Sequence, residues 1–203
     1  MTKTTWHHDA HLFGKPYPTR HRVPERFRIG AVNASDLMEL TAEQALAARA
    51  AHELGHALPW LAAGLDVPRV SLVPQGRLGG HTVVRRTGVS DEARLMALGT
   101  AAGERAEDRW LRVTGLWTSD RAAVVELTAV QDRAQLLECT VPRPTFGTGG
   151  ALDFADLHDM ADQALDQVWA QLTTALPVLV RRGVMSGEEL AACTGLPLPR
   201  SAR

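Results

Sequence analysis

The segment from Leu40 to Gly64 constrains the fold of this 203-residue chain more than any other part of it. It reads LTAEQALAARAAHELGHALPWLAAG and is rich in alanine and leucine, which have high helix propensity. Thr41 followed three residues later by Gln44 is the pattern of a capping box, and Gly64 supplies a C-terminal stop. The sequence therefore predicts one long helix across this segment.

The centre of the expected helix carries the run HELGH, residues 52–56. Histidines four residues apart project from the same face of a helix, so the rings of His52 and His56 can share one metal ion. Glu53 can then act as a general base toward a water molecule, which is the chemistry of the H-E-x-x-H pattern. The alternative is a chance occurrence on a solvated helix face. The apolar neighbours favour the metal, because burying two imidazoles and a carboxylate without partners is costly.

The remaining chain divides into an arm and one domain. Residues 1–36 contain four of the eight histidines and several prolines, with no regular hydrophobic period. This composition predicts an arm that is irregular or ordered only by docking. Residues 37–203 are expected to form the domain. Within it, the runs VPRVSLVPQG and GGHTVVRRTG predict a hairpin or a short mixed sheet, and the later segments show helical spacing, including one helix through DRAAVVELTAVQDRAQLLE.

Composition narrows the classes of partner. The 22 basic and 23 acidic side chains nearly cancel, so there is no electrostatic case for binding nucleic acid or an anionic membrane. Cys139 and Cys193 lie far apart without C-x-x-C spacing, which supports neither a disulfide framework nor a thiolate zinc site. The N-terminus lacks an apolar leader, and there is no run of about 18 apolar residues. We expect a soluble, cytoplasmic protein whose partner is a peptide or protein.

The stretch AAHELGHALPWLAAGLDVPRVSLVPQGRLGGHT resembles the peptidase domain of FtsH-type AAA proteases. In that family a helix bearing H-E-x-G-H-A-L is followed by a strand with V-x-[IL]-x-P-x-G and then by G-x-T. The matching positions here are Val70, Leu72, Pro74, Gly76, Gly80 and Thr82. AAGERAEDRW is similar to the family's G-G-R-x-A-E-E, and VTGLWTSD to its T-G-A-x-x-D. The resemblance spans roughly residues 40–190. It implies a mainly α, α+β fold: a zincin-like helical domain with an H-E-x-x-H helix, a small sheet and a C-terminal helical bundle.

The resemblance also implies a set of site residues. His52, His56 and Asp120 would bind Zn²⁺ and leave an open position for water. Glu53 would take a proton from that water and deliver it to the leaving amine. Glu107 would orient a ligating histidine from outside the ligand set.

The sequence offers more than one acid as the third ligand. Asp120 follows Gly115 by one residue more than the family pattern has. A neighbouring acid such as Glu107 or Asp108 is therefore the alternative third ligand.

The expected function is a stand-alone, ATP-independent zinc metalloendopeptidase that cuts a specific peptide or a flexible protein, because the ATPase module of the family is missing. Val70, Ser71 and Leu72 predict an edge strand that could bind an extended peptide, although an ordinary core strand is equally consistent with the sequence. Two alternatives are a non-hydrolytic binding or regulatory module and a regulatory metalloprotease of the ImmA/IrrE type. Self-association into a homo-oligomer is left open.

The other histidines have simpler interpretations. His7, His8 and His11 could form a second metal cluster, but a solvated tract is favoured. His81 is expected to be a surface histidine. His158 lies in a segment rich in aspartate and is expected to be exposed.

Overall fold

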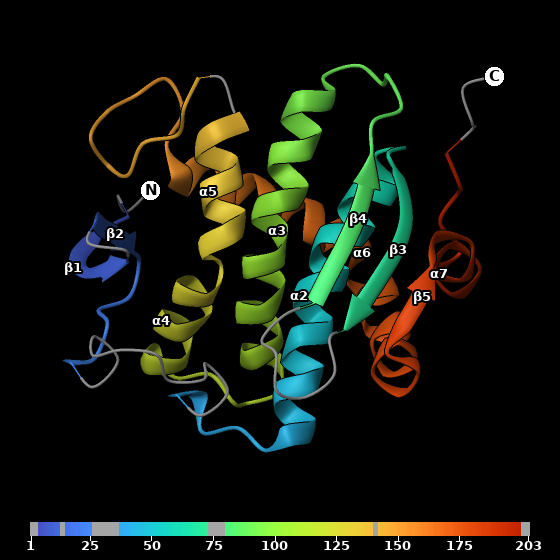
Figure 1. Ribbon diagram of the computed structural model, residues 1–203, viewed down its shortest axis with the longest axis horizontal. Helices are drawn as coiled ribbons and strands as arrows, with labels where there is room; N and C mark the ends of the chain where they lie inside the picture. Colours follow the sequence, from blue (N-terminus) through green and yellow to red (C-terminus); the bar gives the residue numbers. More distant parts are fainter. Residues whose placement is uncertain (1–3, 13–14, 26–36, 73–79, 140–141, 200–203) are drawn as a thin grey trace.

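The centre of the molecule is a pair of long helices, α2 (Ala42–Ala62) and α3 (Glu92–Val113), that pack along each other (Figure 1). The computed structural model describes residues 4–12, 15–25, 37–72, 80–139 and 142–199. A third long helix, α6 (Phe154–Arg182), packs across both and forms the layer behind them. The described residues are mainly helical with two small antiparallel sheets, which confirms the α+β class.

Helix α2 begins where the sequence predicts. The Gln44 N–H donates to the Thr41 hydroxyl, and the Thr41 N–H donates to the Gln44 side chain, so the capping box is confirmed. Gly64 follows the helix with φ of 84°, a conformation that glycine adopts without strain. Every residue from Ala50 to Leu61 is buried. The H-E-x-x-H run therefore lies in the protein interior and not on a solvated helix face.

Small residues allow α2 and α3 to approach closely. Gly55 of α2 faces Ala102, Gly103 and Ala106 of α3. A Cβ atom at Gly55 would collide with the Ala106 side chain and would lie 2.8 Å from the Ala102 carbonyl oxygen. Gly103 in turn leaves the space that the His56 ring fills. The position of the metal-binding candidates thus depends on glycine and alanine on the facing helix.

The larger sheet lies along α2 and has the strand order β4-β3-β5. Its strands are β3 (Asp66–Leu72), β4 (Gly80–Arg85) and β5 (Val184–Ser186), all paired antiparallel. The β3–β4 pair confirms the expected hairpin. Strand β5 comes from the far end of the chain, and it joins the sheet directly after α6.

Strand β3 is central in this sheet, so the edge-strand prediction for Val70, Ser71 and Leu72 is wrong. Val70 is paired with Thr82 on one side and with Met185 on the other. The backbone of β3 is therefore already hydrogen-bonded on both sides and offers no edge to a peptide. Within the described residues, the two edge strands of this sheet are β4 and β5.

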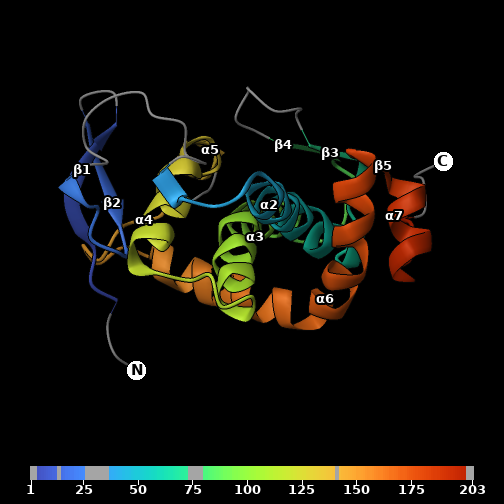
Figure 2. The ribbon, with the colours of Figure 1, turned by 90° about the horizontal axis from the view of Figure 1, so that it is seen from below.

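The N-terminal arm is more regular than its sequence suggests. Strands β1 (His7–Leu12) and β2 (Lys15–Thr19) form an antiparallel hairpin, so the expectation of irregular structure is wrong there and the alternative, an arm ordered by docking, fits. The hairpin lies at the end of the molecule opposite the C-terminal helix (Figure 2). It docks through Tyr17, whose hydroxyl donates to the Glu126 carbonyl oxygen at 2.7 Å. Part of the expected arm, residues 26–36, lies outside the described residues.

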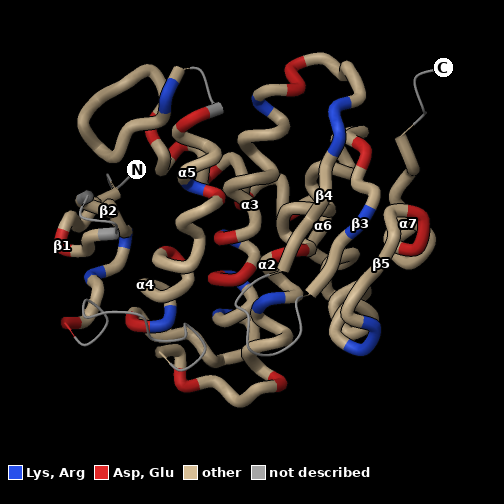
Figure 3. The backbone as a smooth tube through the Cα atoms, in the orientation of Figure 1, with Lys and Arg blue, Asp and Glu red and all other residues tan. Residues whose placement is uncertain are grey.

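The segment after α3 folds into several helices. Helix α4 (Ser119–Thr128) begins at the cap Thr118, and α5 (Val130–Cys139) follows it, where the sequence predicts one continuous helix. Helix α7 (Gly187–Thr194) has the expected Ser186 cap. Acidic and basic positions are interspersed along these elements (Figure 3). None of the described helices is both long enough and apolar enough to span a lipid bilayer.

The tight contact between α2 and α3 predicts the outcome of Gly55→Ala. Overpacking of this kind destabilises a core by about 1–3 kcal/mol, and we expect it to outweigh the gain in helix propensity of about 1 kcal/mol. Urea denaturation followed by circular dichroism should show a lower free energy of unfolding. Ala62→Ser, which adds one heavy atom at an exposed position of the same helix, should leave it unchanged. Equal or higher stability of Gly55→Ala would contradict the packing described.

Candidate metal centre

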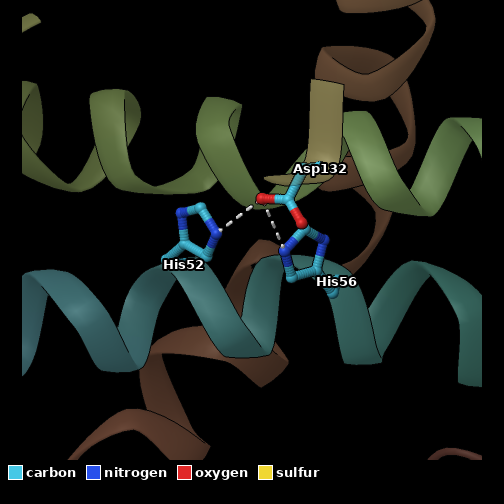
Figure 4. Close-up of side chains that lie close together, drawn as sticks. All are labelled: His52, His56 and Asp132. Carbon is cyan, nitrogen blue, oxygen red and sulfur yellow. Dashed lines mark hydrogen bonds and ion pairs between the residues drawn. The ribbon is translucent and has the colours of Figure 1, made fainter. Parts of the chain in front are cut away.

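His52 and His56 lie one turn apart on α2, and Asp132 reaches them from the first turn of α5 (Figure 4). The Nε2 atom of His52 lies 3.1 Å from Asp132 Oδ2, and the Nε2 atom of His56 lies 3.5 Å from the same oxygen. Both histidines are only 5% exposed, whereas the Asp132 side chain is 26% exposed. The two rings and the carboxylate therefore converge on one point that solvent can approach from the side of α5.

This group could hold a metal ion. One ligand atom from each of the three residues lies within 4.8 Å of the others. Imidazole nitrogen and carboxylate oxygen are ligands that divalent transition metals bind. In the part of the chain that the structure describes, no second such group occurs, so the β1 histidines do not form one.

The third member of the group is Asp132 and not Asp120, which corrects the prediction from the sequence. Asp120 stands in the first turn of α4 and lines an open cavity of about 670 Å³ together with Arg20 and His21. Glu107 and Asp108, the alternatives, are also outside the group. The physical reason is the break between α4 and α5, which begins a new helix at Val130 and turns Asp132 toward α2.

The second ring nitrogen of each histidine is held by an acceptor. His52 Nδ1 lies 3.0 Å from Glu107 Oε2, so Glu107 occupies the orienting position that the resemblance implies. His56 Nδ1 lies 2.9 Å from the carbonyl oxygen of Gly99. A carbonyl oxygen only accepts, so the proton must be on Nδ1 of His56. This arrangement leaves the Nε2 lone pairs for a metal, as outer partners of metal-binding histidines commonly do.

Packing fixes the His56 ring further. The ring stacks on Trp60 with a centroid distance of 5.6 Å and an interplanar angle of 18°. The Trp60 indole N–H donates to the Met96 carbonyl oxygen at 3.2 Å. Gly99 leaves room for the Trp60 ring, since a Cβ atom there would overlap it. The indole thus ties the end of α2 to α3 and limits rotation of His56.

Glu53 faces strand β4. The hydroxyl of Thr82 donates to Glu53 Oε2 at 2.9 Å, and the same hydroxyl lies 3.0 Å from the Glu53 carbonyl oxygen. A Cβ atom at Gly80 would collide with the Glu53 carboxylate, so glycine is required there. These contacts explain the G-x-T spacing in physical terms: the glycine makes space for the carboxylate, and the threonine two residues later orients it.

The charged groups of the site shift one another's pKa values. Burial alone would lower the pKa of His52, but its hydrogen bonds to Asp132 and Glu107 outweigh burial and raise the pKa to about 10. Burial would likewise lower the pKa of His56, and the charge of Asp132 raises it. Burial would raise the pKa of Asp132, but the charge of His56 and the hydrogen bond from His52 hold it well below its usual range. Without a metal, the site is therefore an imidazolium–carboxylate pair.

Two other histidines have clear positions. His81 of β4 is exposed, as expected. His158 is fully buried, so the expectation of exposure is wrong. Its ring makes an edge contact with Phe154 at 4.8 Å, and its Nδ1 atom lies 3.2 Å from a guanidinium nitrogen of Arg20. His158 lies on the apolar side of α6, together with Phe154, Ala161 and Leu165.

Comparison of the chain with protein-family models and with curated protein sequences gives no match. The likeness to FtsH-type peptidases consequently rests on the quoted motifs alone.

The raised pKa of His52 predicts the pH dependence of the metal-free protein. The contribution of charged His52 to the free energy of unfolding should be fully present below its unfolded pKa of about 6.5 and be lost as the pH rises through about 10. Chemical denaturation in the presence of a chelator should show this decline. Asp132→Asn, which removes the carboxylate charge, should flatten it. The assignment would be contradicted if the free energy of unfolding of the wild-type protein rose between about pH 6.5 and pH 10 and if Asp132→Asn lowered it only at acid pH.

Proposed function

We propose that this protein is a zinc-dependent metalloendopeptidase that hydrolyses peptide bonds in a peptide or a flexible protein segment without ATP. The observation that supports this best is the convergence of the His52 and His56 Nε2 atoms on one Asp132 oxygen, beside the carboxylate of Glu53. Two histidines, an acid from another helix and a neighbouring glutamate are the parts that zinc peptidase chemistry requires.

The spacing of the three side chains supports zinc as the metal. With metal–ligand distances of about 2.0–2.1 Å and tetrahedral angles, two ligand atoms are separated by about 3.3 Å. The two nitrogen–oxygen separations, 3.1 and 3.5 Å, bracket that value. Three protein ligands of this kind leave a fourth position for water or substrate, which distinguishes a catalytic zinc site from a structural one.

Zn²⁺ held there would polarise a peptide carbonyl and make a water molecule more acidic. Glu53 accepts a proton from the attacking water and delivers it to the leaving amine. Thr82 holds one oxygen of that carboxylate, so the other oxygen is left for the proton transfer. Glu107 and the Gly99 carbonyl keep both imidazoles in the tautomer that can ligate.

The sheet suggests how a substrate would bind. Strand β4 stands at the outer side of the described sheet and carries Thr82, which contacts Glu53. An extended peptide that added to the free side of β4 would lie next to the general base. Such binding requires an extended segment that can enter the site, so the substrate is a peptide, a terminus or a flexible loop.

The metal ligands are testable by zinc affinity. Competition with a chromophoric chelator should show one zinc per chain. Asp132→Ala should weaken binding by at least about 100-fold, because removal of a direct ligand exceeds the 10–100-fold loss typical of an outer partner. Asp120→Ala is the matched control and should leave the affinity unchanged. The opposite pattern, a loss with Asp120→Ala alone, would restore the third ligand expected from the sequence and contradict this site.

The general base is testable with Glu53→Gln. This variant should retain zinc and lose roughly 100- to 10,000-fold in kcat/KM on a panel of fluorogenic peptides or on casein, since general-base catalysis contributes that much. Glu43→Gln, an exposed position on the same helix, should keep full activity. Zinc binding without any hydrolysis that depends on Glu53 would reject the peptidase and favour a non-hydrolytic regulatory module.

A further inference from the structure

A buried cluster of charges adjoins the metal centre. Arg133, the residue after Asp132, is 2% exposed. Its guanidinium donates to both oxygens of Glu104 on α3, at 2.8 and 2.6 Å, and to Glu126 Oε2 on α4 at 3.2 Å. A buried guanidinium is tolerated only when its donors are paired. Arg133 therefore fixes the first turn of α5 to both neighbouring helices.

The N-terminal hairpin completes this cluster. The remaining guanidinium nitrogen of Arg133 donates to the Pro18 carbonyl oxygen of β2 at 2.6 Å. The Arg20 backbone N–H donates to Glu126 Oε2 at 2.5 Å, and His21 Nδ1 lies 2.6 Å from Glu126 Oε1. The Tyr17 hydroxyl donates to the Glu126 carbonyl oxygen. Helices α3, α4 and α5 and the arm thus meet at one set of hydrogen bonds.

The arm also satisfies hydrogen-bonding groups of this cluster. Glu104 and Glu126 place two carboxylates around the single buried guanidinium of Arg133. The arm brings the Arg20 backbone N–H and the His21 ring to Glu126. If the arm left, Glu126 would lose its contacts with the Arg20 N–H and the His21 ring, and one guanidinium nitrogen of Arg133 would lose its acceptor. Unpaired buried charges are strongly unfavourable, so the start of α5 would have to shift.

We propose that the β1–β2 hairpin, together with residues 19–21, is a clasp that positions Asp132 as a metal ligand through Arg133. Docking of the hairpin and binding of the metal are consequently coupled: a partner or protease that removes the hairpin from α4 and α5 weakens metal binding. This regulation rests on the proposed zinc site. Arg133 and the hairpin act through Asp132 and do not touch the metal or the substrate.

Thermodynamic coupling is reciprocal, which gives the proposal two independent readouts. If the hairpin strengthens zinc binding, zinc must strengthen docking of the hairpin by the same factor. The route passes through Asp132, so removal of that carboxylate should abolish the coupling in both directions.

The first measurement is the zinc affinity of the full chain by chelator competition. His52→Ala gives the baseline for zinc bound elsewhere. The double variant Tyr17→Phe/His21→Ala removes two hairpin contacts. We expect its zinc affinity to fall by at least about fivefold, the equivalent of one typical hydrogen bond. In the Asp132→Ala background the same double variant should have no effect. Arg22→Gln, an exposed position in the same arm, is the matched control.

The second measurement takes its main result from the wild-type protein, so that result does not depend on how the variants fold. Hydrogen exchange of the backbone N–H groups of Lys15, Tyr17, Thr19, Arg20 and His21 is followed with and without zinc. We expect zinc to slow exchange at Arg20 in the wild-type protein and not in Asp132→Ala.

The outcomes separate the two proposals. If wild type and His52→Ala bind zinc equally well, both the proposed zinc site and the proposed clasp are rejected. A His52-dependent zinc site with unchanged Arg20 exchange overturns the clasp alone. The clasp is equally overturned if the double variant loses zinc affinity to the same extent with and without Asp132, because this would show general destabilisation.

Discussion

The structure depends on one electrostatic arrangement in the interior, in which two imidazole nitrogens face a single oxygen of Asp132. Neither His52 nor His56 is solvated, so each ring nitrogen must be satisfied by the protein or by an ion. Glu107 and the Gly99 carbonyl satisfy the Nδ1 atoms, and the Nε2 atoms share the carboxylate. A divalent cation between these groups would satisfy all of them at once.

The surrounding fold provides the space and the supports for this arrangement. Glycines at 55, 99 and 103 let α3 approach α2, and Gly80 makes room for the Glu53 carboxylate. On the far side, the buried ion pairs of Arg133 hold the start of α5 against α3 and α4. The site is therefore built from a tight seam of small residues on one side and a cluster of paired charges on the other.

The sequence predicts the site residues that lie close together on one helix. It does not predict the site residue that comes from a distant segment of the chain. His52, Glu53 and His56 lie on one predicted helix, where the i, i+4 spacing places the two histidines on one face and Glu53 next to the first of them. The third ligand depends on how α4 and α5 pack, and no local pattern marks the helix break near Ala129 that turns Asp132 inward. The burial of His158 could have been found, because it falls three to four residues from apolar neighbours along α6. The prolines and histidines of the arm give no strand pattern, so the sequence does not predict the hairpin. Its order comes from contacts with the distant residues Glu126 and Arg133.

The most direct test of the central claim is the anomalous difference density of a crystal of the zinc-loaded protein, measured at the zinc absorption edge. The account predicts one strong peak within about 2.0–2.2 Å of the Nε2 atoms of His52 and His56 and of a carboxylate oxygen of Asp132. A peak bound by the β1 histidines, or one that touches His52 and His56 while Asp132 stays in contact only with protein atoms, would contradict it.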